Sequence, residues 1–265
     1  MTRFWDRYSS WEEAEAAWDA DPNAAPSLHA SLPPIRVKGL RFKSLWWMIT
    51  QDTGGTLRRQ FFRKPFRYTV NYLFSLCRKK PYTREGDLFF YSLPSIDAFY
   101  TELQNPRTHL VVGFSYCQKP TECPDMRFSS ACRHDPENPV CRACPIAKAI
   151  NALPEKRVTY VVIPRVHDIA RTLFEVGAAH PAHKILFLIS SCELSLVAFG
   201  DFANMASFRG IGVRLEGQTC PNFRAFELAE AGIKRGRTHF QNPGRFFQLL
   251  RTIRSLTGAR GAREE

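Results

Sequence analysis

The fold class is decided by the short apolar stretch HLVVGF, which occupies His109–Phe114. Its aliphatic and β-branched side chains, bounded by turn residues, predict a buried β-strand. Three later stretches have the same character, and they are Val158–Pro164, Lys184–Ser190 and Gly212–Glu216. Helical segments separate the four strands, as in sheets whose parallel strands are joined by crossover helices. The sequence therefore predicts an α/β fold with about four strands in a mainly parallel sheet.

Apolar residues recur at helical spacing between and after these strands. In the helix expected over His167–Val176, for example, Ile169 and Leu173 share one face. The other helices expected here are Pro145–Leu153, Glu193–Phe208, Pro221–Gly232 and Pro243–Leu256. Because this alternating pattern begins after Pro106, we expect a cysteine-rich α/β domain over residues 106–265.

Residues 1–105 have a different pattern. The first 35 residues contain one short helix, with Ser10 and Glu13 spaced as a capping box, and then a proline-rich stretch that is typical of a tether. Between Leu40 and Lys80 the helical spacing is broken by glycines and a proline, which predicts two or three short helices. We therefore expect an N-terminal tether and helical region before the α/β domain.

The composition is that of a globular protein with excess positive charge. Hydrophobic residues make up 44% and charged residues 23% of the 265 residues, which excludes a wholly disordered, collagen-like or coiled-coil chain. The 37 lysines and arginines exceed the 25 acidic residues by 12, so we expect an anionic partner. No apolar run reaches the roughly 18 to 20 residues of a spanning helix, and the N-terminus lacks the pattern of a secretory signal. These features predict a cytoplasmic protein.

Seven of the eight cysteines lie in the predicted α/β domain. Cys117, Cys192 and Cys220 each follow a predicted strand, at the edge where open parallel sheets bind ligands, so we expect them to converge. In a reducing cytoplasm, metal or redox chemistry is favoured over a disulfide framework. The eighth, Cys77, stands alone within a helical pattern and is expected to be buried as a small hydrophobic residue.

The remaining cysteines lie in a long, proline-broken loop after the first strand, and they are Cys123, Cys132, Cys141 and Cys144. The gap of two residues between Cys141 and Cys144 lets both sulfurs face one metal, and Pro145 suits the first turn of a helix. The charged and polar neighbours of these cysteines argue against a core role. The loop therefore predicts thiolate ligation of an iron–sulfur cluster or of structural zinc, which the spacing alone does not separate.

Four short motifs follow one another in this half of the chain. They are CQKPTECP at Cys117–Pro124, CRACPIAK at Cys141–Lys148, SCEL at Ser191–Leu194 and GQTC at Gly217–Cys220. Together they resemble a prokaryotic cysteine-rich family catalogued as domain of unknown function one-one-six, over about residues 107–235. The resemblance implies an iron–sulfur cluster, most simply of the 4Fe-4S type, rather than a particular reaction. The family tends to carry one more cysteine three residues before the CxxC pair, where this chain has Asn138.

With this resemblance, we expect Cys123, Cys141 and Cys144 to hold the cluster together with a fourth cysteine. We take Cys117 as that ligand, and Cys132 is the alternative. All four thiolates of such a set bind iron.

Cys192 and Cys220 are then cofactor ligands of a second site, or a redox pair. A second cluster would need Cys132 and a ligand other than cysteine, for which His134 and His167 are the nearest candidates. Two acidic residues at the same edge are expected mainly to stabilise helix starts, and they are Asp168 and Glu193.

A basic stretch precedes the α/β half. No acidic residue occurs between Asp52 and Glu85, and lysines and arginines alternate there with aromatic residues. Interfacial helices bind membranes in this way, with aromatic side chains at the acyl boundary and cations at the head groups. We therefore expect residues 56–84 to contact an anionic membrane surface. A nucleic-acid partner, or packing against the α/β half, fits the same composition.

These features predict an iron–sulfur protein with a redox or electron-transfer role, which works with a redox partner protein in the cytoplasm or at the inner membrane face. No phosphate-binding loop or hydrolase motif is present, so no catalytic residue is assigned. The main alternative is a structural zinc module that docks nucleic acid or a protein. A third is a thiol redox protein in which Cys192 and Cys220 form a disulfide, which requires α-carbons within about 7 Å.

Overall fold

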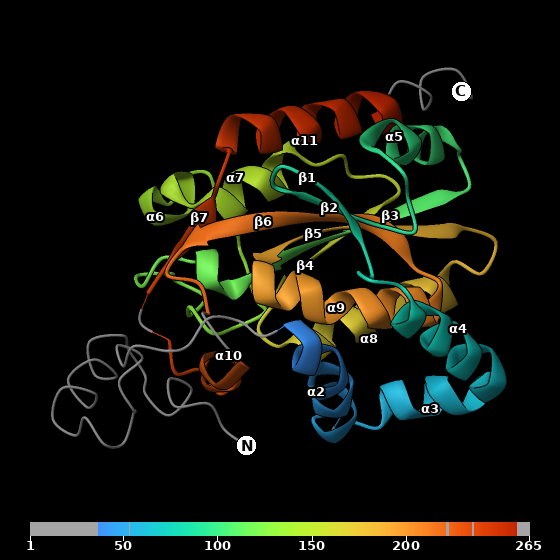
Figure 1. Ribbon diagram of the computed structural model, residues 1–265. Helices are drawn as coiled ribbons and strands as arrows, with labels where there is room; N and C mark the ends of the chain where they lie inside the picture. Colours follow the sequence, from blue (N-terminus) through green and yellow to red (C-terminus); the bar gives the residue numbers. More distant parts are fainter. Residues whose placement is uncertain (1–36, 53, 221–222, 235, 259–265) are drawn as a thin grey trace, which may run out of the picture.

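A mixed seven-stranded sheet runs through the part of the chain that the computed structural model describes, residues 37–52, 54–220, 223–234 and 236–258. The strand order is β1-β2-β6-β5-β3-β4, with β7 also paired to β6, and helices cover both faces (Figure 1). The predicted α/β class is confirmed. The helix and tether expected over the first 35 residues lie outside the described residues.

Four parallel strands form the centre of the sheet. They are β3 (Thr108–Ser115), β4 (Val158–Ile163), β5 (Lys184–Cys192) and β6 (Arg209–Gly217), and they confirm the four predicted strands. β5 lies between β3 and β6, and β4 lies beyond β3. Phe187 of β5 is in register with Gly210 of β6, where a Cβ would lie 2.2 Å from the Phe187 carbonyl oxygen. This close approach explains the glycine.

Three short antiparallel strands were not predicted, and they make the expectation of about four mainly parallel strands wrong. They are β1 (Thr83–Glu85), β2 (Leu88–Tyr91) and β7 (Thr238–Phe240). β2 pairs with β6 and β1 pairs with β2, while β7 pairs with the far end of β6. Strands of three or four residues are too short to show an alternating pattern in the sequence. Because β2 belongs to this sheet, the boundary expected at residues 105/106 separates segments that pair within one sheet.

The helices form two layers against the sheet and a third layer outside one of them (Figure 1). On one face lie α5 (Ile96–Gln104), α6 (Pro139–Ala143), α7 (Pro145–Ala152) and α11 (Pro243–Gly258). On the other face lie α8 (Val166–Ala179), α9 (Glu193–Ala206) and α10 (Phe223–Glu230). The third layer packs on α8 and α9 and consists of α2 (Val37–Thr50), α3 (Thr56–Arg63) and α4 (Pro65–Cys77). The five helices predicted after residue 106 are confirmed, as are the short helices between residues 40 and 80.

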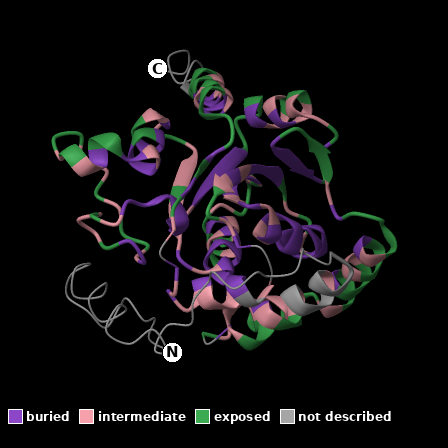
Figure 2. Ribbon diagram, turned by 60° about the vertical axis from the view of Figure 1, so that its left-hand side comes forward, coloured by how far each residue is buried: buried purple, intermediate pink, exposed green. Residues whose placement is uncertain are grey.

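The sheet is buried on both faces, and Figure 2 shows its strands largely in purple. In β2, Leu88 and Phe90 pack in the core beneath α5 and α11, while Phe89 and Tyr91 pack in the core beneath α9. All four side chains are at most 2% exposed. Helices cover these strands on both faces. Because both faces are buried, the strands have continuous apolar runs.

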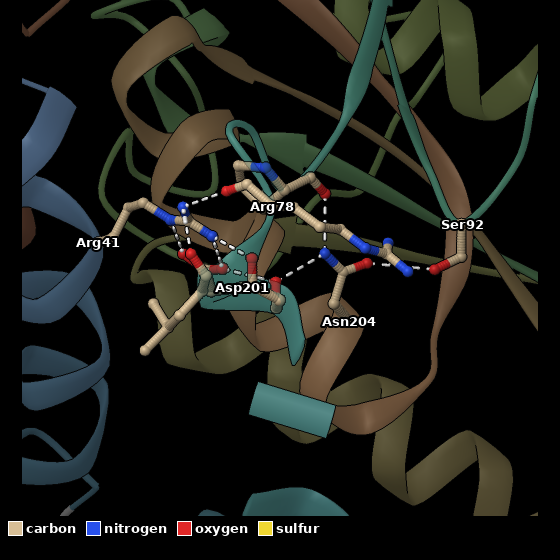
Figure 3. Close-up of polar contacts among 8 residues, drawn as sticks. Arg41, Arg78, Ser92, Asp201 and Asn204 are labelled. Atoms are coloured by element: carbon tan, nitrogen blue, oxygen red, sulfur yellow. Dashed lines mark hydrogen bonds and ion pairs between the residues drawn. The ribbon is translucent and has the colours of Figure 1, made fainter. Parts of the chain in front are cut away.

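A buried ion pair fixes the third layer to α9 (Figure 3). The Arg41 guanidinium of α2 donates to both carboxylate oxygens of Asp201 in α9, at 2.7 and 2.6 Å. The same guanidinium donates to the Ser75 carbonyl oxygen of α4 at 2.6 Å, and the Ser75 hydroxyl donates to Asp201 at 2.6 Å. Asn204, one helical turn after Asp201, donates to the Ser75 hydroxyl and to the Pro81 carbonyl oxygen, both at 2.9 Å. One carboxylate on α9 thus holds two helices of the outer layer.

Replacing Asp201 should destabilise the protein more than replacing an exposed carboxylate. The Asp201 side chain is 2% exposed, so Asp201→Asn leaves the Arg41 charge without its buried partner, and we expect a loss of about 3 to 5 kcal/mol. The matched control is Glu175→Gln, whose exposed ion pair with Arg171 should contribute less than about 1 kcal/mol. Urea unfolding of both variants measures the difference, and equal losses would contradict this role of Asp201.

Candidate functional site

The seven cysteines of the α/β half lie on segments that follow the carboxyl ends of β3, β5 and β6 (Figure 1). Cys117 lies in a 3-10 turn, Tyr116–Gln118, directly after β3. Cys192 is the last residue of β5 and the N-cap of α9, and Cys220 follows β6. The other four lie between the 3-10 turn and α7. Their interactions divide six of the thiols into two groups of three.

The loop after β3 is folded around a buried lysine, Lys119, which is 1% exposed. Its ammonium donates to three carbonyl oxygens, of Met126 at 2.9 Å, Ser129 at 3.0 Å and Ala131 at 2.6 Å. These hydrogen bonds replace the water that the ammonium loses on burial. They explain how a loop with little regular structure holds one conformation.

The first thiol group consists of Cys123, Cys132 and Cys144, and it lies around this ammonium. Burial lowers the pKa of Lys119, and the three thiols together with Asp125 oppose that shift. Burial also raises the pKa of Cys123 and of Cys132, and it outweighs the opposing effects of Lys119 and of a backbone N–H two residues further along the chain, so the net shift of both is upward. Smaller upward contributions to these two pKa values come from neighbouring thiols, Cys144 in both cases. The three thiols are therefore electrostatic neighbours of one another and of one cation.

Cys141 lies one turn before Cys144, in the short helix α6. The Asn138 side-chain oxygen caps this helix by accepting from the backbone N–H groups of Val140 and Cys141, at 3.0 and 3.2 Å. The Cys144 backbone N–H donates to the Cys141 carbonyl oxygen at 3.0 Å, and both side chains are 6% exposed in the same core. Asn138, which stands where the resembling family tends to have a cysteine, thus positions the CxxC turn instead.

The second thiol group consists of Cys117, Cys192 and Cys220, and it surrounds another buried lysine. Lys234 is 3% exposed, and its ammonium donates to the Cys220 sulfur at 3.6 Å and also contacts Cys117. Burial lowers the pKa of Lys234, but the three thiols outweigh this effect, and the net shift is upward. Lys234 is therefore a fixed cation beside three sulfurs.

Cys192 and Cys220 form a hydrogen-bonded pair within this group. The hydrogen bond from Cys220 holds the pKa of Cys192 well below its ordinary value, with further help from Lys234 and from the hydroxyl and backbone N–H of Ser195. The Ser195 hydroxyl lies 3.2 Å from the Cys192 sulfur. The same hydrogen bond and burial raise the pKa of Cys220. The pair therefore ionises first at Cys192, while Cys220 keeps its proton.

The charges buried near these sulfurs are positive. Arg127, which is 2% exposed, donates to the Gly236 carbonyl oxygen; burial lowers its pKa, and Cys117 and Tyr116 oppose that shift. The nearby carboxyl group of Glu230 accepts from the Val166 backbone N–H at 3.0 Å, and burial raises its pKa to about 8. Glu230 is therefore largely neutral at pH 7. Negative charge near the two lysines comes from the Asp125 carboxylate beside Lys119 and from the Cys192 sulfur beside Lys234.

A small cavity of about 50 Å³ lies at the ends of the strands. Its lining includes Cys117, Cys192, Ser195, Glu230 and Lys234. This volume holds a few water molecules. The cavity therefore brings a neutral carboxyl, two thiols and an ammonium around one space, which suits proton transfer between them.

The structure places the predicted histidine ligands elsewhere. The ring nitrogens of His134 contact Asn151 at 2.7 Å and the Tyr160 hydroxyl at 3.1 Å, so the ring lies against α7 and β4. His167 is buried in the first turn of α8 beside Asp168, and burial lowers its pKa. In the described part of the chain, neither ring forms a hydrogen bond to a cysteine sulfur.

Other sequence-based expectations have mixed outcomes. Asp168 stabilises a helix start as predicted, since its carboxylate accepts from the Arg165 backbone N–H at 3.2 Å. Glu193 lies in the first turn of α9 and forms ion pairs with Arg84 at 3.0 Å and Arg214 at 3.2 Å. The expectation that Cys77 is buried is wrong, because it lies exposed on the outer side of α4 at the end of that helix.

Sequence reasoning missed three residues of this site, Lys119, Lys234 and Glu230. Lys119 stands between Cys117 and Cys123 in the CQKPTECP motif, which is a local signal. Lys234 and Glu230 have no such signal, because lysine and glutamate at helical spacing usually lie at the surface.

A single metal ion and an iron–sulfur cluster require different arrangements of the cysteine ligands. Among the described residues, no three Cys, His, Asp or Glu side chains are arranged to hold a single metal ion. A four-iron cluster binds each of its four thiolates through a different iron, so its ligands are spread more widely than those of one ion. Backbone N–H groups beside sulfurs, as at Cys123 and Cys132, are among the features that tune such clusters.

Comparison with protein-family models, with curated proteins and with solved structures gives no match to this chain. The resemblance to the cysteine-rich family thus rests on the four quoted motifs.

Replacing Glu230 should change how stability depends on pH. Because the folded-state pKa of about 8 exceeds the ordinary value of 4.5, the folded state binds the proton more tightly, and stability falls as the pH rises from about 5 to 8. Glu230→Gln removes this dependence, which amounts at most to about 1.4 kcal/mol per pH unit.

The measurement is urea unfolding of the wild type and Glu230→Gln at several pH values. Glu175→Gln, at an exposed position of α8, should follow the wild-type curve. Curves of the wild type and Glu230→Gln that stay parallel would contradict the raised pKa.

Proposed function

We propose that this protein binds an iron–sulfur cluster through the first thiol group and Cys141, and serves in redox or electron transfer. The observation that carries the proposal is that three cysteines of one loop, Cys123, Cys132 and Cys144, are neighbours of the single buried ammonium of Lys119, with Cys141 one helical turn before Cys144. A buried ammonium without negative charge nearby is strongly destabilising. Cysteine binds metals as the thiolate, so a metal group held by these cysteines would place negative charge beside Lys119.

The proposed ligands are Cys123, Cys132, Cys141 and Cys144. In this set Cys132 replaces Cys117, the fourth ligand expected from the sequence. Cys132 is an electrostatic neighbour of Cys123 and Cys144, whereas Cys117 contacts Lys234. A cluster held there would supply one-electron chemistry at a potential that depends on net charge and on hydrogen bonds to sulfur. Lys119 contributes one fixed positive charge, and the N–H groups beside Cys123 and Cys132 contribute the hydrogen bonds.

Structural zinc is the alternative for the same residues. Structural zinc takes a tetrahedral set of four sulfurs, or of sulfur and histidine. The position of His134, whose ring contacts Asn151 and Tyr160, supports an all-cysteine set. An all-cysteine set and the resemblance of the four cysteine motifs support the cluster over zinc.

Metal analysis of protein purified without oxygen tests the proposal. We expect about four iron and four acid-labile sulfide per chain, with a broad visible absorption band. Cys132→Ser should lose most of the iron, whereas Cys117→Ser and the exposed control Cys77→Ser should keep it.

Two results would count against these assignments. Stoichiometric zinc without sulfide would overturn the cluster. Loss of iron in Cys117→Ser with retention in Cys132→Ser would restore the sequence-based ligand set instead.

The Cys192–Cys220 pair supports a second candidate function, thiol–disulfide exchange. The Cys192 thiolate, whose pKa is lowered, would attack an acceptor disulfide and release one thiol as a mixed disulfide forms. The Cys220 sulfur would then attack Cys192, releasing the second thiol and forming the Cys192–Cys220 disulfide. One dithiol is oxidised as one disulfide is reduced, so atoms and electrons balance.

Mass spectrometry after treatment with a small disulfide tests this exchange. We expect each chain to lose two hydrogens, and Cys192→Ser to abolish the loss while Cys77→Ser does not. A wild-type protein that forms only a stable mixed disulfide, or none, would contradict the exchange.

A further inference from the structure

The outer layer of helices presents an apolar stripe to solvent. On α4, Phe66, Val70, Leu73 and Phe74 are 88, 48, 55 and 67% exposed, and their spacing places them on one side of the helix. Phe62, in α3, continues the stripe at 74% exposure. Large exposed apolar side chains in a contiguous patch indicate a binding surface.

The opposite side of α4 is already used inside the protein. Tyr68 and Ser75 are buried, and the Asn71 side chain donates to the Met205 carbonyl oxygen of α9 at 3.1 Å. Through Ser75, α4 also joins the Arg41–Asp201 network of Figure 3. The stripe therefore faces outward because the inner face is fixed against α9.

Positive charge borders the stripe. Arg63, Lys64 and Arg67 are exposed at the junction of α3 and α4, and Lys79 and Lys80 are exposed after α4 ends. The sequence has no acidic residue from residue 53 to 84, so no carboxylate within this segment neutralises them. The surface thus combines outward apolar side chains with cations, as interfacial helices do.

An apolar cavity lies beneath the stripe. It has a volume of about 310 Å³, and its lining includes Leu45, Met48, Leu57, Phe61 and Phe62. The cavity lies between the outer layer and α8 and α9, and Phe62 belongs both to its lining and to the exposed stripe. The cavity therefore extends the exposed apolar stripe into the interior of the protein.

We propose that α3 and the outer side of α4 dock onto an anionic phospholipid bilayer. Phe62, Phe66, Val70 and Phe74 enter the acyl boundary, and the bordering cations bind head groups. Among the described residues no helix has the length and hydropathy to cross a membrane, so the attachment is of the interfacial kind. This inference is independent of what the cysteines bind.

Two other partners, single-stranded nucleic acid and a second copy of the chain, fit this surface less well. Single-stranded nucleic acid stacks on aromatic rings, but Val70 and Leu73 offer no ring. A second copy of the chain would bring identical cations such as Arg63 and Lys64 together across a two-fold interface, which is unfavourable. A bilayer accepts aliphatic side chains and neutralises the cations.

Cosedimentation with vesicles at low salt tests the proposal. We expect the full-length protein to sediment with vesicles that contain phosphatidylglycerol, and much less with vesicles of phosphatidylcholine alone. Higher salt should weaken binding, because the attraction of the cations is screened. Phe66→Ser with Phe74→Ser, and separately Arg63→Gln with Lys64→Gln, should each weaken binding roughly tenfold or more.

Matched controls lie on other faces of the molecule. Met126→Ser removes an exposed apolar side chain, at 55% exposure, and Arg251→Gln with Arg254→Gln removes two exposed cations from α11. Both controls should bind like the wild type, and unfolding midpoints verify that all variants fold.

Three outcomes would overturn the proposal. The first is equal sedimentation with both kinds of vesicle, and the second is wild-type binding by the α3–α4 variants. The third is a dimer or a nucleic-acid complex that these variants disrupt while vesicle binding remains unchanged.

Discussion

An ammonium group buried among sulfurs is the constraint on which the rest of this site depends. Lys119 and Lys234 are almost fully buried, and each has cysteine sulfurs as its main source of negative charge. Lys119 is also compensated by three carbonyl oxygens and by Asp125, whereas protonated thiols would leave Lys234 without compensation in a medium of low dielectric. The folded arrangement therefore favours the ionised form of Cys192, whereas burial raises the pKa of Cys123 and of Cys132. At Cys192, ionisation compensates a buried cation and also makes the sulfur a nucleophile.

The central strands could be predicted from the sequence because burial on both faces leaves a clear record in it. Stretches such as HLVVGF and KILFLIS are continuous apolar runs, and turn residues mark their ends. β2 and β7 leave no such record, because they have only three or four residues and pair with β6 through long-range contacts. The β1–β2 hairpin is local and its Gly86–Asp87 turn is a sequence signal, but the flanking runs are too short to show a strand pattern. β2 is the instructive case: LFFY is wholly buried, but four residues do not distinguish a strand from part of a helix.

The gathering of cysteines could likewise be predicted, since parallel topology carries Cys117, Cys192 and Cys220 to one edge. Their division into two groups could not, because it depends on two lysines. Lys119 and Lys234 look like surface residues until the tertiary fold buries them. For the same reason, the spacing of the loop cysteines could not show whether Cys117 or Cys132 is the fourth ligand. The 3-10 turn directs Cys117 toward Lys234. Lys119, two residues later, points into the loop instead.

Helix α9 joins the two surfaces for which we propose functions. It begins at Cys192 of the second thiol group, and Asp201 lies nine residues further along, roughly 14 Å at 1.5 Å per residue. At Asp201 the helix holds Arg41 of α2 and Ser75 of α4, so the outer layer is attached to the same rigid element that positions a thiol. A bilayer docked on α4 would therefore lie at a fixed distance and orientation from the cysteine edge. If both proposals hold, such an arrangement would favour exchange of electrons with a partner that is itself held at the membrane, because both proteins would then meet in one orientation rather than by free tumbling in solution.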